Sequence, residues 1–564
     1  MRAHALAVPL LFAACAAARL LGGEATATLH IDAAADRRPI NPEIYGVAFA
    51  STADLQELNT PLNRYGGNHT SRYNWKLNAD NRGFDWFFES IPLKSSEPGA
   101  EVDGIIARTV AAGGRALVTI PANGWVAKIG PNRERLWSYS VTKYGAQTRA
   151  DPETSPDAGN GVRACDGQPI RDNDPLDANQ PATPEFQRGW IEHLTARWGR
   201  GTDSAIRCYL LDNEPSIWHE THRDLFKVAP TSAYLRDALV DTAMMIRKVD
   251  PAARIGAPQE WGWDAFFHSS SDREWAVTHG REATDSPDTI ARGGMDYFPW
   301  LLRELAAREK ESGVRLLDMV TFHWYPQGGE YSGDVSPAIQ RMRNRSTRIF
   351  WDPGYTDPTW VNGVVRLIPR LRELVAENYP GRTLGITEYN WGAEGHINGA
   401  TAQADILGLF GREGLDLATR WMTPPGDSPT FKVFQLYRNY DGRCSTFGDT
   451  AVRLTNSADS DELSAFAAER SSDGALTLMV VAKSLENTTE LALEFPSAGP
   501  TAGGGAAAGG NVVGGAALQA QVWQLTAANR IERLADVPVL AGKACVKVPA
   551  QSVTLLVLPK PAAK

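Results

Sequence analysis

The 564-residue sequence predicts an α/β fold, a (β/α)8 TIM barrel with an attached β-sandwich domain. Two patterns carry this prediction. Between about residues 42 and 425, short apolar runs alternate with amphipathic helical stretches, which is typical of parallel βα units. After about residue 450, apolar residues recur with period two around turn residues such as Asp473-Gly474, which indicates antiparallel strands.

The first pattern contains eight candidate strands, and eight parallel strands favour a closed barrel. They span residues 43–50, 62–67, 115–121, 208–214, 254–259, 316–325, 383–389 and 416–422. The helices between them are marked more clearly. Thr183, Pro184 and Glu185 form a helix start that precedes apolar residues at helical spacing up to Gly199, and a second helix is expected over 232–249.

Four segments are expected along the chain. Residues 1–25 are typical of a secretory signal peptide, because one early arginine precedes a short apolar run and small residues. That run is too short for a membrane anchor, and its flanks match a lipid-attachment signal at Cys15 only loosely. Residues 26–41 hold a lone strand that we expect to join the sandwich, residues 42–450 form the barrel, and residues 451–564 form the C-terminal β-sandwich. The Gly/Ala-rich stretch 498–517 predicts a flexible loop. The protein is therefore expected to be secreted, either extracellular or periplasmic.

Composition narrows the possible partners. A formal charge of −9 without runs of Lys or Arg argues against nucleic acids and anionic membranes. The four cysteines beyond the predicted signal have no zinc-site spacing, and disulfides are allowed but not required; they are Cys165, Cys208, Cys444 and Cys545. The 17 Trp and 15 Tyr supply flat rings that can stack on sugars, although most such rings pack in cores.

Two glutamates stand where predicted strands end. One is Glu214 in the run DNEP (212–215), and the other is Glu388 at the end of TLGITE, which places them on strands four and seven. Hydrolysis of a glycosidic bond needs one carboxyl group that donates a proton and one that attacks or stabilises the anomeric carbon. A single strand-end Glu is usually an ordinary solvated or ion-paired carboxylate. The pair, with an Asn directly before Glu214, favours a catalytic interpretation, with Glu214 and Glu388 as the catalytic residues.

Several nearby residues are candidates for binding substrate. Asn213 is placed to hydrogen-bond a sugar 2-hydroxyl, and Arg64 is placed to keep Glu388 ionised. Tyr325 and His323, at the end of strand six, could contact the nucleophile or a sugar hydroxyl. Indoles expected at the barrel rim are Trp324, Trp391, Trp421 and Trp125. Each of these residues also has a structural alternative, such as a core indole or a surface ion pair.

Specific motifs resemble glycoside hydrolase family 44. They include NRYGGNHTSRYNW, YLLDNEPSIWHETHRD, TFHWYPQGGEY and ITEYNWGAEGHINGATAQADILGLFGREG, and the resemblance runs from about residue 38 to 560. It implies a (β/α)8 barrel with a β-sandwich that cleaves β-1,4-glucans, such as cellulose derivatives and xyloglucan, with retention. It also implies Glu214 as the acid/base and Glu388 as the nucleophile. The expected partner is thus a β-1,4-linked polysaccharide, cleaved internally by a monomeric enzyme.

Other interpretations stay open at this point. A hydrolase of another type is disfavoured, because GxSxG is absent and HETH (219–222) is one residue short of HExxH. A non-catalytic carbohydrate-binding protein would not need both glutamates. A retaining glycosidase acting on mannan or xylan remains an alternative, since no residue determines the preferred polysaccharide. No metal or other cofactor is expected for catalysis. A structural calcium is conceivable at an acidic cluster, for which a solvated loop is the simpler interpretation: Asp166, Asp172, Asp174 and Asp177.

Overall fold

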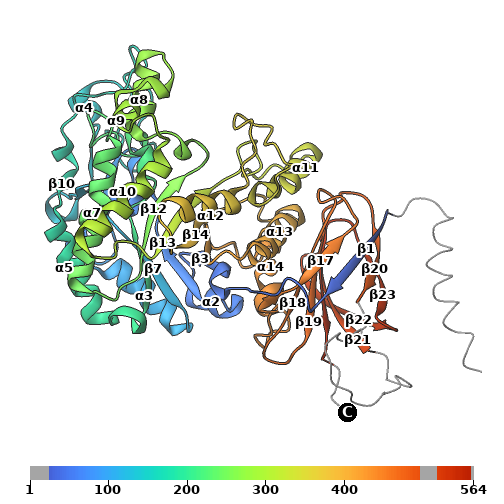
Figure 1. Cartoon of the computed structure of the whole chain (residues 1–564). Coiled ribbons are helices and arrows are strands. Elements are labelled where there is room, and N and C mark those ends of the chain that lie inside the picture. The colour runs from blue at the N-terminus through green and yellow to red at the C-terminus, as the bar shows by residue number, and fades with distance from the viewer. Residues whose placement is uncertain (1–24, 496–517, 561–564) are drawn as a thin grey trace, which may run out of the picture.

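The computed structural model describes residues 25–495 and 518–560. All but the last residue of the predicted signal peptide and the whole Gly/Ala-rich loop lie outside these residues, as does Cys15. The described chain forms a barrel and a β-sandwich, with helices α13 and α14 between them (Figure 1). No helix in these two described ranges has both the length and the apolar character needed to cross a membrane.

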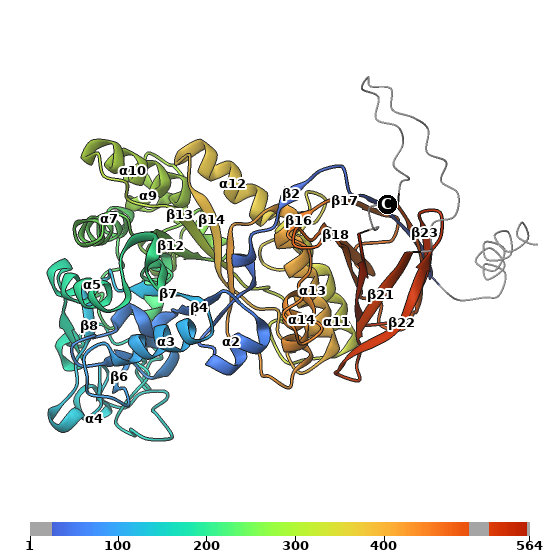
Figure 2. The ribbon, with the colours of Figure 1, turned by 90° about the horizontal axis from the view of Figure 1, so that it is seen from below.

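Eight parallel strands close into the predicted barrel, and each lies within or beside its candidate segment. Around the barrel the order is β11-β12-β13-β14-β15-β3-β4-β7, with β7 paired to β11. Five of these strands, β4, β7, β12, β13 and β14, are labelled in Figure 2. The strands are β3 (Gly46–Ala48), β4 (Leu62–Tyr65), β7 (Arg115–Ile120), β11 (Ile206–Leu211), β12 (Ile255–Trp261), β13 (Met319–Trp324), β14 (Thr383–Tyr389) and β15 (Leu417–Arg420). The prediction of a (β/α)8 barrel is therefore confirmed.

One principal helix follows each barrel strand. These helices are α2 (Thr52–Leu58), α3 (Ala100–Ala111), α5 (Pro184–Trp198), α7 (Ser232–Val249), α10 (Tyr297–Ser312), α12 (Leu367–Asn378), α13 (Ile397–Glu413) and α14 (Pro429–Arg438). Thr183 takes the N-cap position of α5 and Pro184 its first position, as the sequence predicts, and α7 occupies the predicted range 232–249. Further short helices lie in the connections: α4 (Val141–Tyr144), α6 (Trp218–Thr221), α8 (Ser270–His279), α9 (Pro287–Ala291) and α11 (Pro337–Ser346).

The interior of the barrel changes from apolar to polar along its axis. Alternate residues of a strand point to the same side. A buried apolar layer comes from five barrel strands: Leu62, Leu117, Cys208, Leu210, Met319 and Leu417. Two or four residues further toward the carboxyl ends, the same strands carry buried polar side chains: Arg64, Thr119, Asp212, His323 and Thr419. The carboxyl end of the barrel is thus built to hold polar chemistry, where sites on this fold are expected.

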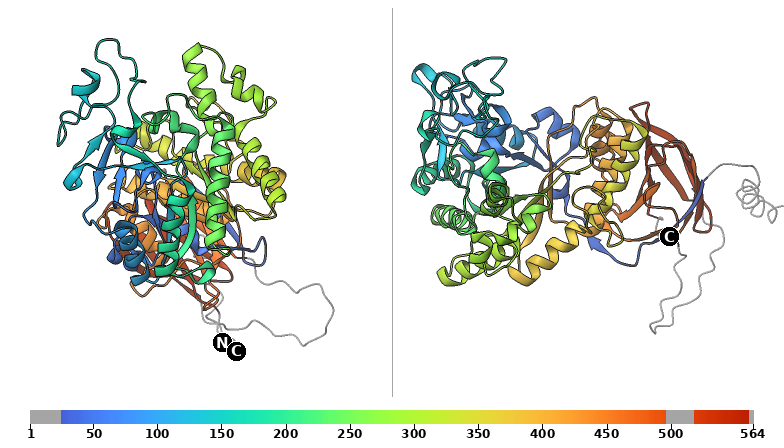
Figure 3. Two further views of the ribbon diagram at one scale, coloured as in Figure 1. Left: turned by 90° about the vertical axis from the view of Figure 1, so that its left-hand side faces the viewer. Right: turned by 90° about the horizontal axis from the view of Figure 1, so that it is seen from above.

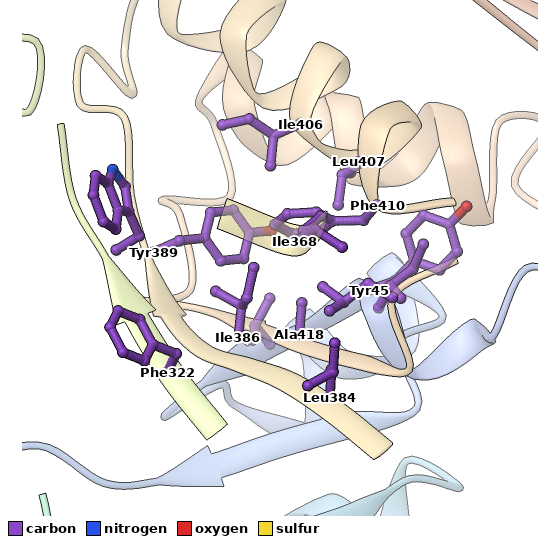
Figure 4. Packing of buried hydrophobic residues seen from close by; sticks show 14 of the residues in the cluster. Tyr45, Phe322, Ile368, Leu384, Ile386, Tyr389, Ile406, Leu407, Phe410 and Ala418 are labelled. Carbon is purple, nitrogen blue, oxygen red and sulfur yellow. The ribbon is translucent and has the colours of Figure 1, made fainter. Parts of the chain in front are cut away.

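Helix α13 joins the barrel to the sandwich. Every residue from Ile397 to Gly411 is buried, because the neighbouring helices α11 and α14, the sandwich strands β18 (Leu463–Glu469), β19 (Leu476–Ala482) and β24 (Ser552–Leu558), and Tyr389 of barrel strand β14 all contact this helix. Figure 4 shows Ile406, Leu407 and Phe410 packed over the side chains of β14 and β15. On the sandwich side, Gly408 lies directly against the ring of Phe466, where a methyl group would meet ring carbons at 2.1 Å.

The sandwich consists of two sheets. One has the order β17-β1-β20-β23 and the other β2-β16-β18-β19-β24-β21-β22. Strand β1 (Ala25–Asp32) pairs in parallel with β20 and antiparallel with β17. The remaining strands are β2 (Arg38–Pro39), β16 (Thr450–Ala451), β17 (Arg453–Asn456), β18 (Leu463–Glu469), β19 (Leu476–Ala482), β20 (Thr489–Glu494), β21 (Leu518–Leu525), β22 (Ile531–Val539), β23 (Lys543–Val548) and β24 (Ser552–Leu558). The N-terminal segment therefore belongs to a sheet that is otherwise C-terminal.

Long excursions leave the barrel at the carboxyl ends of several strands (Figure 3). After β4 and β7 the chain forms two small sheets, from β5 (Ala79–Asn81), β6 (Glu89–Pro92) and β9 (Leu136–Trp137), and from β8 (Trp125–Ala127) and β10 (Asn179–Pro181). After β12 it forms α8 and α9. These connections surround the polar end of the barrel.

Candidate active site

Glu214 and Glu388 meet at the carboxyl end of the barrel. One carboxylate oxygen from each residue and a ring nitrogen of His323 lie within 4.8 Å of one another. The two glutamates are 6% and 5% exposed, and His323 is fully buried. The sequence prediction that strands four and seven bring these carboxylates together therefore agrees with the geometry.

The position of Glu214 depends on a tight turn after β11. Asp212 and Glu214 both adopt left-handed backbone conformations, with φ of 53° and 47°. The buried Asp212 carboxylate accepts hydrogen bonds from the backbone N–H groups of Ala122 (2.6 Å) and Asn123 (3.0 Å), which follow β7. Pro215 then begins a 3-10 turn. Asp212 thus ties two strand ends together and directs the next residues toward the barrel axis.

Glu388 reaches the site through an irregularity in strand pairing. Phe322 of β13 lies opposite Ile386, but the next residue, His323, lies opposite Glu388, so Thr387 is an extra residue in β14. Such a bulge changes the direction of the side chains that follow it. The same device occurs in β12, where Gln259 is the extra residue between Pro258 and Glu260.

Arg64 of β4 connects the elements of the site. Its guanidinium donates to Glu388 (2.7 Å), to the side-chain oxygen of Gln259 (2.8 Å) and to that of Asn213 (3.2 Å). Gly66 leaves the necessary room, since a Cβ there would lie 2.2 Å from the Arg64 Cζ. One planar, permanently charged group thereby fixes residues from three other strands relative to one another.

The pKa values of the two glutamates move in opposite directions. Burial, followed by the negative charge of Glu388, raises the pKa of Glu214 well above its ordinary value. Burial also acts to raise the pKa of Glu388, but neighbouring positive charge and hydrogen bonds from Arg64 and Tyr325 outweigh it and lower that pKa. The Tyr325 hydroxyl lies 2.8 Å from Glu388. The pair is therefore arranged to hold one protonated and one ionised carboxyl group.

His323 contributes hydrogen bonds rather than charge. Burial lowers its pKa to about 3, so the imidazole is neutral at neutral pH and Arg64 supplies the lasting positive charge beside Glu388. Its Nδ1 lies 2.9 Å from Glu214 and its Nε2 lies 3.0 Å from the Thr387 hydroxyl. His323 is thus placed to orient Glu214, whereas the sequence suggested the nucleophile or a sugar hydroxyl as its partner.

The four predicted indoles divide into two groups. Trp324 and Trp391 are buried, at 0% and 2% exposed, and belong to the hydrophobic core around the barrel. Trp391 also donates to Ser346 and packs against Phe350. Their predicted role as sugar-stacking rings is therefore corrected: neither presents a face to a substrate.

The other two indoles remain candidates. Trp421 and Trp125 are partly exposed. Trp421 lies beside Arg64, with the guanidinium 5.7 Å from the ring centroid, and Gly67 leaves the room that this ring occupies.

Sequence reasoning missed several residues of the site. Glu260 is a fully buried carboxyl group whose pKa burial raises to about 7, and it accepts from the Tyr297 hydroxyl (2.8 Å) and the Ser216 backbone (3.3 Å). The bulges that place Gln259 and Glu388 leave no clear trace in the sequence, although Gly66 and Gly67 of RYGGN hint at a close approach of side chains.

Three exposed aromatic side chains lie near the site and were also missed. Phe84 is 59% exposed and precedes Asp85, which Asn68 joins to Asn213. Tyr331 is 48% exposed and packs edge-on against Tyr325, and Trp360 is 54% exposed and donates to Gln327, two residues beyond Tyr325. Their exposure, which the sequence does not reveal, makes them candidates for sugar stacking.

Two groups of acidic residues bear on metal binding. The spacing of Glu214, His323 and Glu388 would allow a metal ion, but direct contacts with Arg64, Tyr325 and each other already engage their polar atoms. In the acidic cluster, the side chains have separate partners: Asp166 accepts from Gln168, Asp174 from Leu176, and Asp177 from Lys143 and Tyr144. The possible structural calcium stays a prediction.

Cysteine pairing stays equally open. Within residues 25–495 and 518–560, Cys165, Cys208 and Cys444 are free thiols, and Cys208 is buried in the barrel interior.

Comparisons with known proteins agree with this fold. The sequence model of glycoside hydrolase family 44 matches residues 79–328. Endoglucanase A of Paenibacillus lautus is 29% identical over 506 residues, which cover 86% of this chain and 67% of that protein. The crystal structure of a bifunctional glucanase-xylanase from a metagenome library is 51% identical, covers 95% of this chain and 100% of its own, and superimposes with a TM-score of 0.89. A Paenibacillus polymyxa family 44 xyloglucanase, solved with xyloglucan, is 25% identical with the same coverage and a TM-score of 0.74. The chain belongs to glycoside hydrolase family 44.

Proposed function

We propose that the protein is a retaining endo-β-1,4-glucanase acting on cellulose-type glucans, on xyloglucan or on both, with Glu388 as nucleophile and Glu214 as general acid/base. The observation that carries this proposal is the approach of the two carboxyl groups within 4.8 Å. Carboxyl groups of retaining glycosidases stand about 5–5.5 Å apart, whereas inverting enzymes need about 6.5–9.5 Å to admit a water molecule. The arrangement therefore favours direct attack by a carboxylate.

The first step uses the charge difference within the pair. Glu388, ionised beside Arg64, attacks the anomeric carbon and forms a glycosyl ester, while the bond to the leaving oxygen breaks. Glu214 gives its proton to that oxygen. The Nδ1 of neutral His323 lies 2.9 Å from one oxygen of Glu214, and in the tautomer with its proton on Nδ1 it donates to that oxygen, which leaves the other oxygen to carry the acid proton.

The second step reverses the role of Glu214. Once Glu388 is esterified, its negative charge is gone, and this charge is the second cause that raises the pKa of Glu214. The pKa of Glu214 therefore falls, and the residue can remove a proton from the incoming water. Water attacks the anomeric carbon from the face that the leaving group vacated, so the β configuration is restored.

An extended substrate fits the surroundings of the pair. Exposed aromatic rings lie on separate connections around it, with Phe84 beyond Asn68 and with Tyr331 and Trp360 beyond Tyr325. Several stacking surfaces around one site suit a polysaccharide that is cleaved within the chain. The relatives named above are described as an endoglucanase, a glucanase-xylanase and a xyloglucanase, which supports a β-1,4-glucan as substrate and keeps xylan as a second candidate. We also propose secretion, from the signal-like residues 1–25.

The test determines the anomeric configuration of the first products and the activities of the Glu388→Ala and Glu214→Ala variants. Proton NMR of the first products from cellohexaose should show the β-anomer before mutarotation, and the α-anomer first would mean inversion. Glu388→Ala should lose turnover on every substrate. Glu214→Ala should retain the first step on 2,4-dinitrophenyl β-cellotrioside, whose leaving group needs no proton, and azide should then yield a β-glycosyl azide. An α-glycosyl azide, or rescue of Glu388→Ala to a β product, would overturn the assignment.

A further inference from the structure

The amide of Asn213 belongs to a chain of hydrogen bonds that runs outward from the barrel axis. Arg64 donates to its oxygen (3.2 Å), and its nitrogen donates to the side-chain oxygen of Asn68 (2.9 Å). The nitrogen of Asn68 donates in turn to both carboxylate oxygens of Asp85 (3.2 Å each). Asn68 follows β4 and Asp85 lies in the 3-10 turn Gly83–Trp86, so the chain spans two separate connections.

The polarity of this chain is fixed at its inner end, where Arg64 can only donate, and it agrees with the outer end, where both oxygens of Asp85 accept. A guanidinium only donates hydrogen bonds and an ionised carboxylate only accepts them. The atom of Asn213 that faces Arg64 must therefore be its oxygen, which directs its NH2 group toward Asn68. The same reasoning places the oxygen of Asn68 toward Asn213 and its NH2 group toward Asp85. Neither amide can turn over without bringing two donors or two acceptors together.

We propose that Asn68 and Asp85 are positioning residues that hold the Asn213 amide so that its second N–H donates to the 2-hydroxyl of the sugar undergoing substitution. This inference rests on the proposed function. The nitrogen of Asn213 carries two protons, of which Asn68 accepts one, so one remains for a ligand. Asn213 directly precedes Glu214, and a hydrogen bond to the 2-hydroxyl strengthens as positive charge develops on the ring.

Without the outer half of the chain, Arg64 alone would hold the amide through its oxygen. That single contact, at 3.2 Å, leaves the NH2 group unrestrained from the side of Asn68. Enzymatic sites lose rate when a donor that acts in the transition state is poorly oriented. The loss of rate should affect only substrates that carry the 2-hydroxyl, because only they accept a hydrogen bond from the oriented N–H of Asn213.

The test compares two substrates, 2,4-dinitrophenyl β-cellotrioside and its analogue lacking the 2-hydroxyl on the ring next to the scissile bond. Asn68→Leu should lower kcat/KM for the first substrate about 10- to 100-fold, the range expected for one oriented hydrogen bond at a charged centre. It should leave kcat/KM for the 2-deoxy substrate within about threefold of the wild type. The 2-deoxy substrate is thus an internal control for a merely structural effect, and Asp237→Asn, exposed on α7, is a control for loss of a distant carboxylate.

A swap of the two side chains makes the test sharper. Asn68→Asp alone places two carboxylates against each other and should impair the enzyme like Asn68→Leu. Combining it with Asp85→Asn restores the polarity, because the new carboxylate accepts from Asn213 and the new amide donates to that carboxylate. The double variant should recover the 2-hydroxyl preference to within about threefold of the wild type, a recovery that a purely steric role would not give.

Three results would overturn the inference. One is equal loss on both substrates in Asn68→Leu, and a second is a double variant no better than Asn68→Asp. The third result concerns the ratio of kcat/KM for the two substrates: if this ratio is the same in the wild type and in Asn213→Ala, the inference is also overturned. Failure of the proposed function is distinguishable, since it shows as the α-anomer in the first products of the wild type, whatever the Asn68 variants do.

Discussion

Replacing Arg64 with Met should remove most activity and move the acidic limb of the pH profile to higher pH. Arg64 and Glu388 are 2.7 Å apart, and their side chains are 0% and 7% exposed. Removing one partner of such a buried pair costs about 3–5 kcal/mol, because the remaining charge is left uncompensated. Protonation of Glu388 relieves that cost, so kcat/KM at neutral pH should fall with the ionised fraction of Glu388, by up to roughly 10²- to 10⁴-fold.

Protonation offers Glu388 a partial escape from this cost. Without Arg64 the pKa of Glu388 rises, since burial then acts with less opposition, and the ionised form that we propose as nucleophile appears only at higher pH. The assay is kcat/KM on 2,4-dinitrophenyl β-cellotrioside against pH, which avoids the need for acid catalysis. Arg64→Lys should recover part of the rate, because it restores the charge but not the planar fork that reaches Asn213 and Gln259.

The matched control is Arg72→Met. Arg72 is also fully buried and ion-paired, with Asp224 at 2.6 Å, but it does not contact Glu388. The Arg72→Met variant should have a lower unfolding temperature, but the acidic limb of its pH profile should not move. An Arg64→Met enzyme within tenfold of wild-type kcat/KM, with an unmoved acidic limb, would refute the reasoning.

Three further predictions concern the rest of the molecule. Gly408→Ala should lower the free energy of unfolding by about 1–3 kcal/mol in chemical unfolding, because the added Cβ would meet the Phe466 ring. The control is Gly104→Ala on α3, where the nearest atom is 3.6 Å away; it should be neutral or stabilising by up to about 1 kcal/mol. Equal stability of the two variants would contradict the close packing of α13 against the Phe466 ring. Lys483→Met should cost about 3–5 kcal/mol, since it leaves the buried Asp405 carboxylate, 2.9 Å away, with the Thr347 hydroxyl as its remaining partner; both side chains of the pair are at most 2% exposed. Adding Asp405→Leu should recover most of this cost, and no recovery would mean that the uncompensated charge is not its cause. Dialysis against EDTA should leave kcat/KM on cellotrioside unchanged, while a loss reversed by Ca²⁺ would establish a calcium requirement.

The sequence was most informative about the barrel, because its strands are short, buried and apolar between clearly marked helices. The predicted strand boundaries were less accurate where the barrel strand begins later than the apolar run does. The first strand was expected over 43–50, but Pro42–Tyr45 forms a 3-10 turn capped by the Asn41 side chain, so β3 begins at Gly46. The sixth was expected over 316–325, yet only Met319–Trp324 lies in the barrel. Apolar runs indicate burial, but they do not say where pairing starts.

The site was predicted in part for a similar reason. Glu214 and Glu388 could be found because each lies at or just beyond the end of a recognisable strand. The error on Trp324 was avoidable: if His323 points into the barrel, the next strand residue points outward, under the helices. By contrast, the extra residues Thr387 and Gln259 shift the register by one, and only pairing with a neighbouring strand reveals them. Single-sequence alternation therefore fails at the positions that aim Glu388 and Gln259.

Those register shifts explain how one arginine can set the geometry of the site. From β4, Arg64 contacts Asn213 beyond β11, Gln259 in β12 and Glu388 in β14. These contacts lie within the barrel, below the long connections that carry Phe84, Tyr331 and Trp360. The separation of the two carboxyl groups, on which the stereochemical outcome depends, is thus held by strand positions and a rigid guanidinium. Substitutions in the connections can then change which polysaccharide binds without changing that separation.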